Sequence, residues 1–178
     1  MTHRERGDER TGGDERTGGD ERTDGGESAD GSERPGRYEL PDGYELSTDP
    51  RRIDAARVHA WLSTDSYWAR GRSREKHDGA IAGSLNFGVY ERASGGQVAY
   101  ARVVTDRTTF ALLCDVYVDR SARGKGLGTA LVAGVRDHLA PFGLRRIMLA
   151  TADAHGVYER LGFSALRSPW DWMVYGEQ

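Results

Sequence analysis

The sequence predicts an α/β protein built on one sheet of mixed strand direction. Apolar residues alternate with polar ones at Leu85, Phe87 and Val89, as in a half-buried strand. A helical stripe, with one apolar residue every four positions, is formed by Leu127, Leu131, Val135 and Leu139. A glycine-rich turn joins the preceding strand to this helix. Because strand-like and helical segments alternate along the chain, helices are expected to cover the sheet.

The expected elements run in the order β-α-α-β-β-β-α-β-α-β-β. Thr48 or Asp49 followed by Pro50 predicts the start of the first helix. The expected strands are Gly43–Ser47, Leu85–Val89, Gln97–Thr105, Thr109–Asp119, Arg145–Ala150, Phe163–Leu166 and Asp171–Tyr175. The expected helices cover Pro50 to Trp61, Ser73 to Ile81, Leu127 to Leu139 and Ala154 to Leu161.

The N-terminal region differs in composition from the rest of the chain. Residues 7–24 repeat a Gly-Asp-Glu-Arg-Thr pattern without an apolar side chain. Such a segment buries too little surface to offset the entropy of ordering. Residues 1–36 are therefore expected to form a disordered acidic arm, either solubilising or serving as an interaction tail. Residues 37–178 are expected to form one folded domain.

Composition narrows the class of protein. Residues 37–178 carry 17 acidic and 19 basic side chains, so no charge block predicts nucleic-acid binding. Cys114 is the single cysteine, which excludes an intramolecular disulfide, and the five histidines show no metal-ligand spacing. No apolar stretch reaches the length of a membrane span and no signal peptide is visible, so a cytoplasmic protein without a membrane partner is expected.

The region of residues 116–131 is the main functional signal. An apolar strand enters a glycine-rich turn that opens directly into a helix, which is how backbone N–H groups are presented to a phosphate. Arg123 and Lys125 add positive charge, and the glycines at 124, 126 and 128 allow unusual φ values. Their spacing fits neither a P-loop nor a dinucleotide-binding fingerprint.

The run Arg123-Gly-Lys-Gly-Leu-Gly128 resembles the [QR]-x-x-G-x-[GA] loop of the GCN5-related N-acetyltransferases, the GNAT family. A second element, Tyr158-Glu-Arg-Leu-Gly-Phe163, resembles the segment that ends the family's core. The resemblance covers residues 44–175. It implies a GNAT-type mixed, mostly antiparallel sheet flanked by helices, with acetyl-CoA as the acetyl donor and no metal.

The resemblance also implies which residues hold acetyl-CoA. The loop would bind the pyrophosphate, and the backbone of the preceding strand would hold the pantetheine arm. The implied cofactor-binding residues are Val116, Val118, Arg123, Gly124, Lys125, Gly126, Leu127, Gly128 and Thr129.

Two residues are candidates for catalysis. Tyr158 matches a tyrosine that in the resembling family lies near the thioester sulfur, where a phenol could protonate the departing thiolate. The alternative is that Tyr158 is an aromatic anchor for the last helix. Asp115 interrupts an apolar strand, where a carboxylate is costly unless paired or functional. Strand alternation predicts that it shares a face with Leu113 and Tyr117. It is a candidate general base, or else a structural carboxylate that binds loop backbone or an arginine.

Three further residues are candidates for the acceptor site. Tyr67 and Trp68 lie in the loop that covers the acceptor in the resembling family, and aromatic rings could wall an amine pocket; core packing is the alternative. His155 could relay a proton near neutral pH, or face solvent at a helix start. Tyr67-Trp-Ala-Arg-Gly71 and Asp153-Ala-His-Gly156 resemble a subgroup of the family whose acceptor is unknown.

The predicted function is an acetyl-CoA-dependent N-acetyltransferase. It would move the acetyl group directly to a primary amine of a small molecule or peptide, as a monomer or homodimer. Two other classes stay open at this point: a non-catalytic acyl-CoA-binding or sensing module, and a nucleotide-phosphate-binding protein that uses the same loop. Binding without turnover would favour the module, and competition by ATP but not CoA would favour the nucleotide binder.

Overall fold

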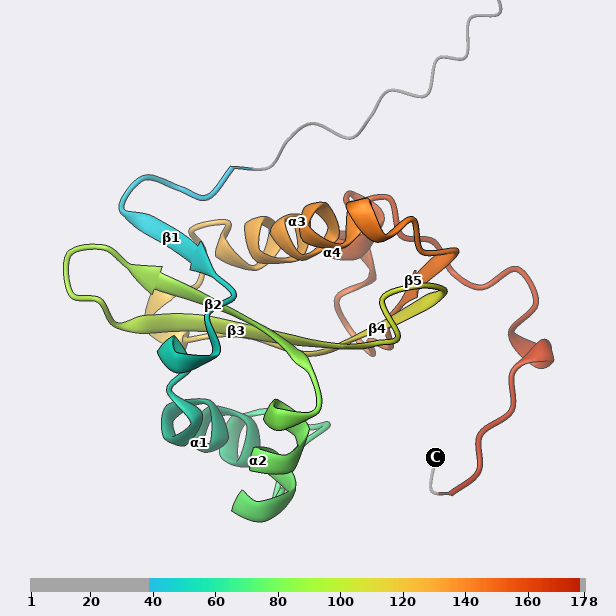
Figure 1. Ribbon diagram of the computed structural model, residues 1–178, viewed down its shortest axis with the longest axis horizontal. Coiled ribbons are helices and arrows are strands. Elements are labelled where there is room, and N and C mark those ends of the chain that lie inside the picture. The colour runs from blue at the N-terminus through green and yellow to red at the C-terminus, as the bar shows by residue number, and fades with distance from the viewer. Residues whose placement is uncertain (1–38, 177–178) are drawn as a thin grey trace, which may run out of the picture. The chain divides into compact units, whose positions relative to one another are not determined.

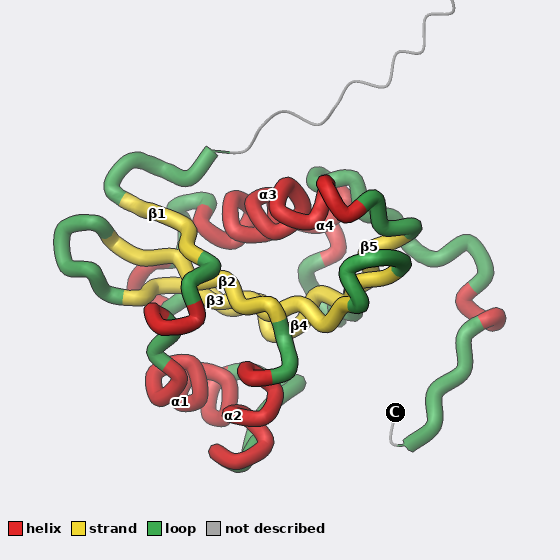
Figure 2. The backbone as a smooth tube through the Cα atoms, in the orientation of Figure 1, coloured by secondary structure: helices red, strands yellow, loops and turns green. Residues whose placement is uncertain are grey.

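The computed structural model describes residues 39–176 of the 178-residue chain. The expected arm of residues 1–36 lies outside the described residues, so its disorder stays a prediction. The described part is a five-stranded sheet with helices on both faces (Figures 1 and 2). The strands are β1 (Tyr44–Ser47), β2 (Leu85–Glu91), β3 (Gln97–Thr105), β4 (Phe110–Val118) and β5 (Arg146–Met148). The helices are α1 (Ala55–Asp65), α2 (Arg74–Ala82), α3 (Leu127–Leu139) and α4 (His155–Glu159).

The strands follow one another across the sheet in sequence order. Strands β1 to β4 pair antiparallel, and β5 pairs parallel to β4. A parallel neighbour requires a crossover, and α3 provides it. The expected mixed, mostly antiparallel sheet flanked by helices is therefore confirmed.

The helices divide between the two faces of the sheet. Figure 1 shows α1 and α2 below the sheet, and α3 and α4 above it. The predicted first helix starts later than expected, because residues from Pro50 to Arg52 form a separate 3-10 turn. Helix α1 has its own N-cap, in which the Asp54 carboxylate accepts from the Arg57 N–H at 3.0 Å.

Two apolar clusters hold these layers together. The larger lies between the sheet and α3, where the predicted stripe of Leu127, Leu131, Val135 and Leu139 is buried. The smaller lies under α1 and is formed by Val58, Leu62, Ala69, Tyr100 and Tyr117. Burial of side chains on both faces fixes β3 and β4 between two layers. These central strands therefore give a rigid support to the site at their ends.

The two strands expected after α4 are wrong. Residues 163–175 are irregular, apart from a 3-10 turn at Pro169–Asp171, so the observed order ends at α4. Trp170 and Met173 expose 77% and 97% of their surface, and the segment runs away from the sheet in Figure 1. A strand exists only when its backbone groups pair with a neighbour. The apolar composition of this segment could not supply that partner.

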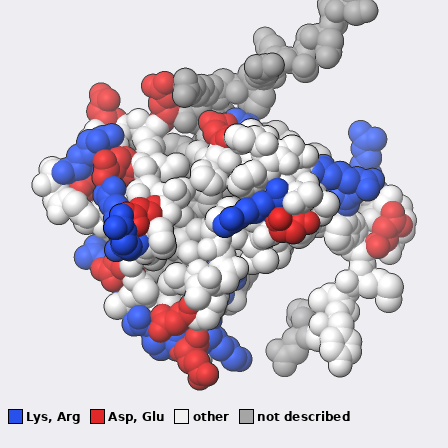
Figure 3. Space-filling model, in the orientation of Figure 1, with Lys and Arg blue, Asp and Glu red and all other residues white. Residues whose placement is uncertain are grey.

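Charged side chains are mixed in sign on the surface. On the face in Figure 3, basic and acidic groups alternate around the rim, with an uncharged area between them. Among residues 39–176, no helix has both the length and the apolar character needed to cross a lipid bilayer.

Candidate functional site

The sheet opens into a fork between β4 and β5. Their pairing covers three steps, which join Phe110 to Arg146, Ala111 to Ile147 and Leu112 to Met148. Strand β4 continues beyond Leu112 to Val118, whereas β5 ends at Met148. Val116 and Val118, the residues expected to contact a pantetheine arm, therefore lie on β4 beyond the last paired position. Their backbone on the side of β5 borders the fork.

A β-bulge interrupts β4 beside the fork. Tyr100 of β3 pairs with Tyr117, but Arg102 pairs with Cys114, so Ala101 opposes both Asp115 and Val116. Asp115 adopts a φ of +52°, in the left-handed region.

Because of the bulge, odd-numbered side chains of β4 lie on opposite faces of the sheet before and after Asp115. Leu113 packs in the cluster under α3, whereas Tyr117 packs in the cluster under α1. The expectation that Leu113, Asp115 and Tyr117 share one face is therefore wrong, because strand alternation does not continue through a left-handed residue.

The Asp115 carboxylate is held by three donors. Arg72 donates through both terminal nitrogens, at 2.6 and 3.0 Å, and Arg102 donates through Nε at 2.6 Å. Trp68 donates through Nε1 at 3.2 Å. Burial opposes ionisation of this side chain, which is only 3% exposed, but the two guanidinium groups outweigh it and lower its pKa. These contacts match the alternative of a structural carboxylate paired with arginine.

The loop between α1 and α2 bridges the fork. The Trp68 ring contacts Asp115 of β4, while the Tyr67 hydroxyl accepts from the Ala152 N–H, beyond β5, at 3.0 Å. The two rings meet edge to face, with centroids 4.9 Å apart. Both side chains are about half exposed. The structure thus brings Tyr67 and Trp68, two of the three predicted acceptor residues, to the fork, each with one polar contact.

Tyr158 and His155 line one cavity. It measures about 530 Å³ and lies between β5, α4 and the chain beyond α4. The Tyr158 ring packs edge to face on Phe163, with centroids 5.8 Å apart. Burial, followed by the influence of Tyr67 and Asp153, raises the pKa of the Tyr158 phenol. The phenol therefore keeps its proton at neutral pH.

The glycine loop leaves the N-terminus of α3 open. Gly124 and Gly126 have φ values of +78° and +77°, which favour glycine. Gly126 is the N-cap residue and supplies no side-chain cap. The Ala130 N–H donates to Gly126 O at 3.0 Å, so the preceding N–H groups of Leu127, Gly128 and Thr129 lack an intrahelical acceptor. These are the N–H groups that the sequence analysis expects to bind the pyrophosphate, which stays a prediction.

Gly128 differs from the two glycines before it. Its φ lies outside the left-handed region, and an added Cβ would meet only a Val118 methyl at 3.5 Å. Of the three glycines that permit an unusual φ, only Gly124 and Gly126 adopt one. Its conformational freedom is therefore not used at this position.

The two basic side chains of the loop contact the protein itself. Arg123 donates through Nε to Val118 O at 3.0 Å, and Lys125 donates through Nζ to the Tyr44 hydroxyl at 2.9 Å. Both add positive potential beside α3. These contacts join the loop to β4 and β1.

Sequence reasoning missed Arg102. It lies in an apolar strand, as Asp115 does, and the same signal of a charge in an apolar run could have identified it. Asp65, which binds two arginines of the loop region, carried no such signal because it ends an amphipathic helix.

Comparison with known proteins identifies the family. The model of the acetyltransferase (GNAT) family matches residues 38–163. A Gibberella zeae protein named "Putative acetyltransferase" is 30% identical over 126 residues, which span 61% of this chain and 71% of that protein. A crystal structure of a putative GNAT-family acetyltransferase from Xanthomonas campestris is 40% identical, with a TM-score of 0.72 over 78% of this chain and 95% of that one.

More distant solved structures share the fold alone. Glucosamine-6-phosphate N-acetyltransferase from Arabidopsis thaliana is 19% identical, with a TM-score of 0.55 over 76% of this chain and 97% of that one. The family match covers the sheet, the glycine loop and the Tyr158 segment that the structure brings around one fork. This chain belongs to the GNAT family and is an acetyltransferase.

Proposed function

We propose that this acetyltransferase moves the acetyl group of acetyl-CoA directly to a primary amine of a small molecule or peptide. The observation that carries the proposal is the uncapped N-terminus of α3, which opens beside the fork between β4 and β5. A helix N-terminus favours anions through its free N–H groups and its dipole. The fork supplies unpaired strand backbone next to it.

These two features suit the two halves of acetyl-CoA. The pyrophosphate would accept from backbone N–H groups between Gly124 and Thr129. The pantetheine arm, which contains amide groups, would follow β4 at the backbone of Val116 and Val118. The thioester would then lie along the fork toward the loop with Tyr67 and Trp68, where the acceptor amine enters.

The reaction needs one bond formed and one bond broken. The amine nitrogen attacks the thioester carbonyl, a C–N bond forms, and the C–S bond breaks to release the CoA thiolate. The amine loses one proton, and the thiolate takes up another. Direct attack uses no covalent enzyme intermediate, so positioning and proton transfer carry the catalysis.

We assign protonation of the thiolate to Tyr158. Its raised pKa keeps the phenol protonated at neutral pH, as a general acid requires. A protein thiol ordinarily has a pKa about 2 units below that of a phenol, so the transfer is uphill, and the raised pKa of Tyr158 makes it more so. The step therefore depends on the position of the phenol beside the departing sulfur. Packing against Phe163 holds the ring in one place.

The proton of the amine is assigned to His155 rather than Asp115. Asp115 was the sequence-based candidate base, but two guanidinium groups already bind its carboxylate and lower its pKa. A carboxylate so stabilised is a poor proton acceptor. We place Asp115 as the anchor of the acceptor loop. His155 lines the same cavity as Tyr158, three residues before it, and its imidazole suits a proton relay.

Tyr158→Phe tests the assignment of the general acid. Turnover should fall about 10²- to 10⁴-fold, as is typical when a general acid is removed, with CoA affinity nearly unchanged. The measurement is steady-state kinetics on an acceptor found by screening amino acids, polyamines, aminoglycosides and peptide N-termini.

Tyr90→Phe is the matched control for this experiment. Tyr90 lies on β2, and no hydrogen-bond partner of its buried hydroxyl is observed in the described structure. Near-wild-type turnover in Tyr158→Phe would remove Tyr158 from the mechanism. Tight CoA binding without turnover on the whole panel would favour the acyl-CoA-binding module instead.

A further inference from the structure

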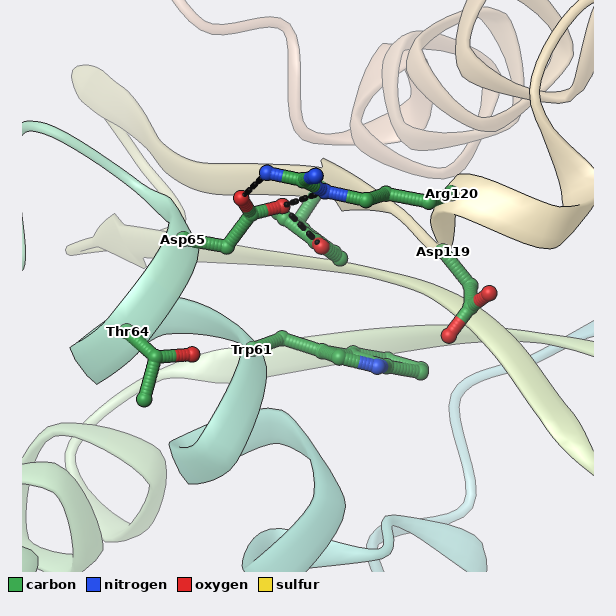
Figure 4. A pocket seen from close by; sticks show the side chains of 6 residues that line it. Trp61, Thr64, Asp65, Asp119 and Arg120 are labelled. Atoms are coloured by element: carbon green, nitrogen blue, oxygen red, sulfur yellow. Dashed lines mark hydrogen bonds and ion pairs between the residues drawn. The ribbon is translucent and has the colours of Figure 1, made fainter.

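Asp65 connects α1 to the region of the glycine loop, and the proposed chemistry gives it no role. It is the last residue of α1, and its carboxylate contacts Arg120 (Figure 4). The same carboxylate also contacts Arg123. Arg120 donates through Nε at 2.9 Å and also through Nη2, and Arg123 donates through Nη2 at 3.3 Å. The Tyr117 hydroxyl donates to the same carboxylate at 2.6 Å. Arg120 first, and then Tyr117, hold the pKa of Asp65 well below its usual range.

The two arginines are open to solvent. Arg120 exposes 74% of its side chain and Arg123 exposes 51%, whereas the Asp65 side chain exposes 16%. Arg120 and Asp65 lie on the wall of a surface pocket of about 380 Å³. A dissolved anion can therefore reach these guanidinium groups without any rearrangement of the core.

Both arginines belong to the segment that leads into α3. Arg120 starts the short turn after β4, and Arg123 ends it, directly before Gly124. The proposed pyrophosphate site begins at that glycine. A guanidinium group binds phosphate and carboxylate through the same donors, so the two anions compete for it.

The other end of this connection is the acceptor loop. Asp65 is followed by Ser66, which is buried and donates to Leu62 O at 2.6 Å, and then by Tyr67 and Trp68. A change in the contacts of Asp65 would therefore affect the first residues of the loop that contains Tyr67 and Trp68.

We propose that Asp65 competes with the phosphates of the cofactor for Arg120 and Arg123, and thereby couples cofactor binding to the acceptor loop. The inference rests on the proposed use of acetyl-CoA. In the free protein the two arginines bind Asp65. When the phosphates draw them away, the start of the acceptor loop loses its tie. Asp65 is thus a positioning residue that opposes cofactor binding and responds to it.

The test compares two ligands in binding calorimetry. CoA carries the phosphates, and pantetheine carries the same arm without them. Asp65→Asn should bind CoA about fivefold or more tightly than the wild type, the lower end of typical couplings between sites, with pantetheine affinity unchanged. Asp49→Asn is the matched control, since it removes the same charge from a surface pair with Arg51, on the turn before α1.

Unchanged or weaker CoA binding in Asp65→Asn, with normal binding in the wild type, would overturn this inference alone. Absence of CoA binding in the wild type would overturn the proposed function as well. Arg120→Gln, at an exposed position, provides a second route: it should weaken CoA binding and leave pantetheine binding unchanged, and unaltered CoA affinity would contradict the proposal.

Hydrogen exchange tests the coupling. CoA should speed amide exchange in residues 66–72 of the wild type and have a smaller effect in Asp65→Asn. A merely structural Asp65 would give the same CoA response in both proteins. Equal responses would overturn the coupling.

Discussion

Two aspartates of this protein each bind a pair of arginines, but in different surroundings. Asp115 binds Arg72 and Arg102 in the bulge of β4, where its side chain exposes 3% of its surface and theirs 18% and 15%. Asp65 binds Arg120 and Arg123 at the end of α1, where the arginines are 74% and 51% exposed.

Burial determines what each cluster can do. In the bulge, the Asp115 carboxylate and the two guanidinium groups are all largely buried. Removal of Asp115 would therefore leave two poorly solvated positive charges without a partner. Beside the glycine loop, water or a dissolved anion can replace the carboxylate at little cost. The same chemical group therefore supports the architecture in one place and is free to respond to a ligand in the other.

Asp115→Ala should give the largest change in stability. Removing one partner of a buried ion pair leaves uncompensated charge, which typically costs ~3–5 kcal/mol. Urea denaturation of Asp115→Ala and Asp65→Ala measures the difference, and Asp65→Ala should lose much less. Equal losses in the two variants would break the comparison.

The contribution of Asp115 to stability should depend on pH in the acid range. Its pKa in the folded protein is lowered, so its contribution to stability is complete above the pKa of an unfolded aspartate, about 4. That contribution is lost as the pH falls through the lowered folded value. Asp115→Asn should therefore show a flatter fall in stability below pH ~4 than the wild type, measured by denaturation at several pH values.

Asp115→Asn also distinguishes an anchor from a catalytic base. A base would show turnover that recovers at higher pH, where more of the amine is already deprotonated. An anchor would show lost stability at neutral and high pH, without recovery of turnover. Recovery at unchanged stability would restore Asp115 as the base.

Gly126→Val tests whether the glycine loop, beside the exposed arginines of Asp65, binds CoA. The φ of +77° is strained for a β-branched residue, so the loop should no longer present its amides. Saturating CoA at ~100 times its dissociation constant should stabilise the wild type by ~2.7 kcal/mol and the variant far less, in a thermal-shift assay. Gly128→Ala is the matched control, since its added Cβ makes only an ordinary contact. A wild type that does not respond to CoA would contradict the cofactor assignment.

Deletion of residues 1–36 should have the smallest effect. The repeated segment contains no apolar side chain that could pack on the domain. Both arginine–aspartate clusters lie outside it, so melting temperature and CoA affinity should stay close to those of the full chain. A large drop in melting temperature on truncation would show that the arm packs on the domain.

Local patterns predicted most of the sheet and its helices. Alternation identified the central strands, and the four-residue spacing identified α3 with its observed ends, Leu127 and Leu139. These patterns succeed because each of the elements buries one face against the neighbouring layer. The glycine loop was also predicted from the sequence, since glycine tolerates the positive φ values that Gly124 and Gly126 adopt.

Predictions from pattern failed where a residue depends on distant partners. The segment from Phe163 to Tyr175 has strand-like composition, but pairing needs a free neighbouring edge in reach. Asp115 was identified as unusual, but Arg72 lies 43 positions away and Arg102 lies 13 positions away along the chain. Without these partners, the proposed role of an anchor could not be separated from that of a base.

The sequence by itself determined the family, the strand and helix content through α4, and the glycine loop before α3, because each depends on residues adjacent in the chain. Only the tertiary structure decided the faces of β4, the partners of Asp115 and the tie between Asp65 and the glycine loop. The bulge turns β4 over at one left-handed residue. Asp65 of α1 meets Arg120 and Arg123 only after α1 has packed on the sheet. Arg72, in the loop after α1, meets Asp115 in the same way.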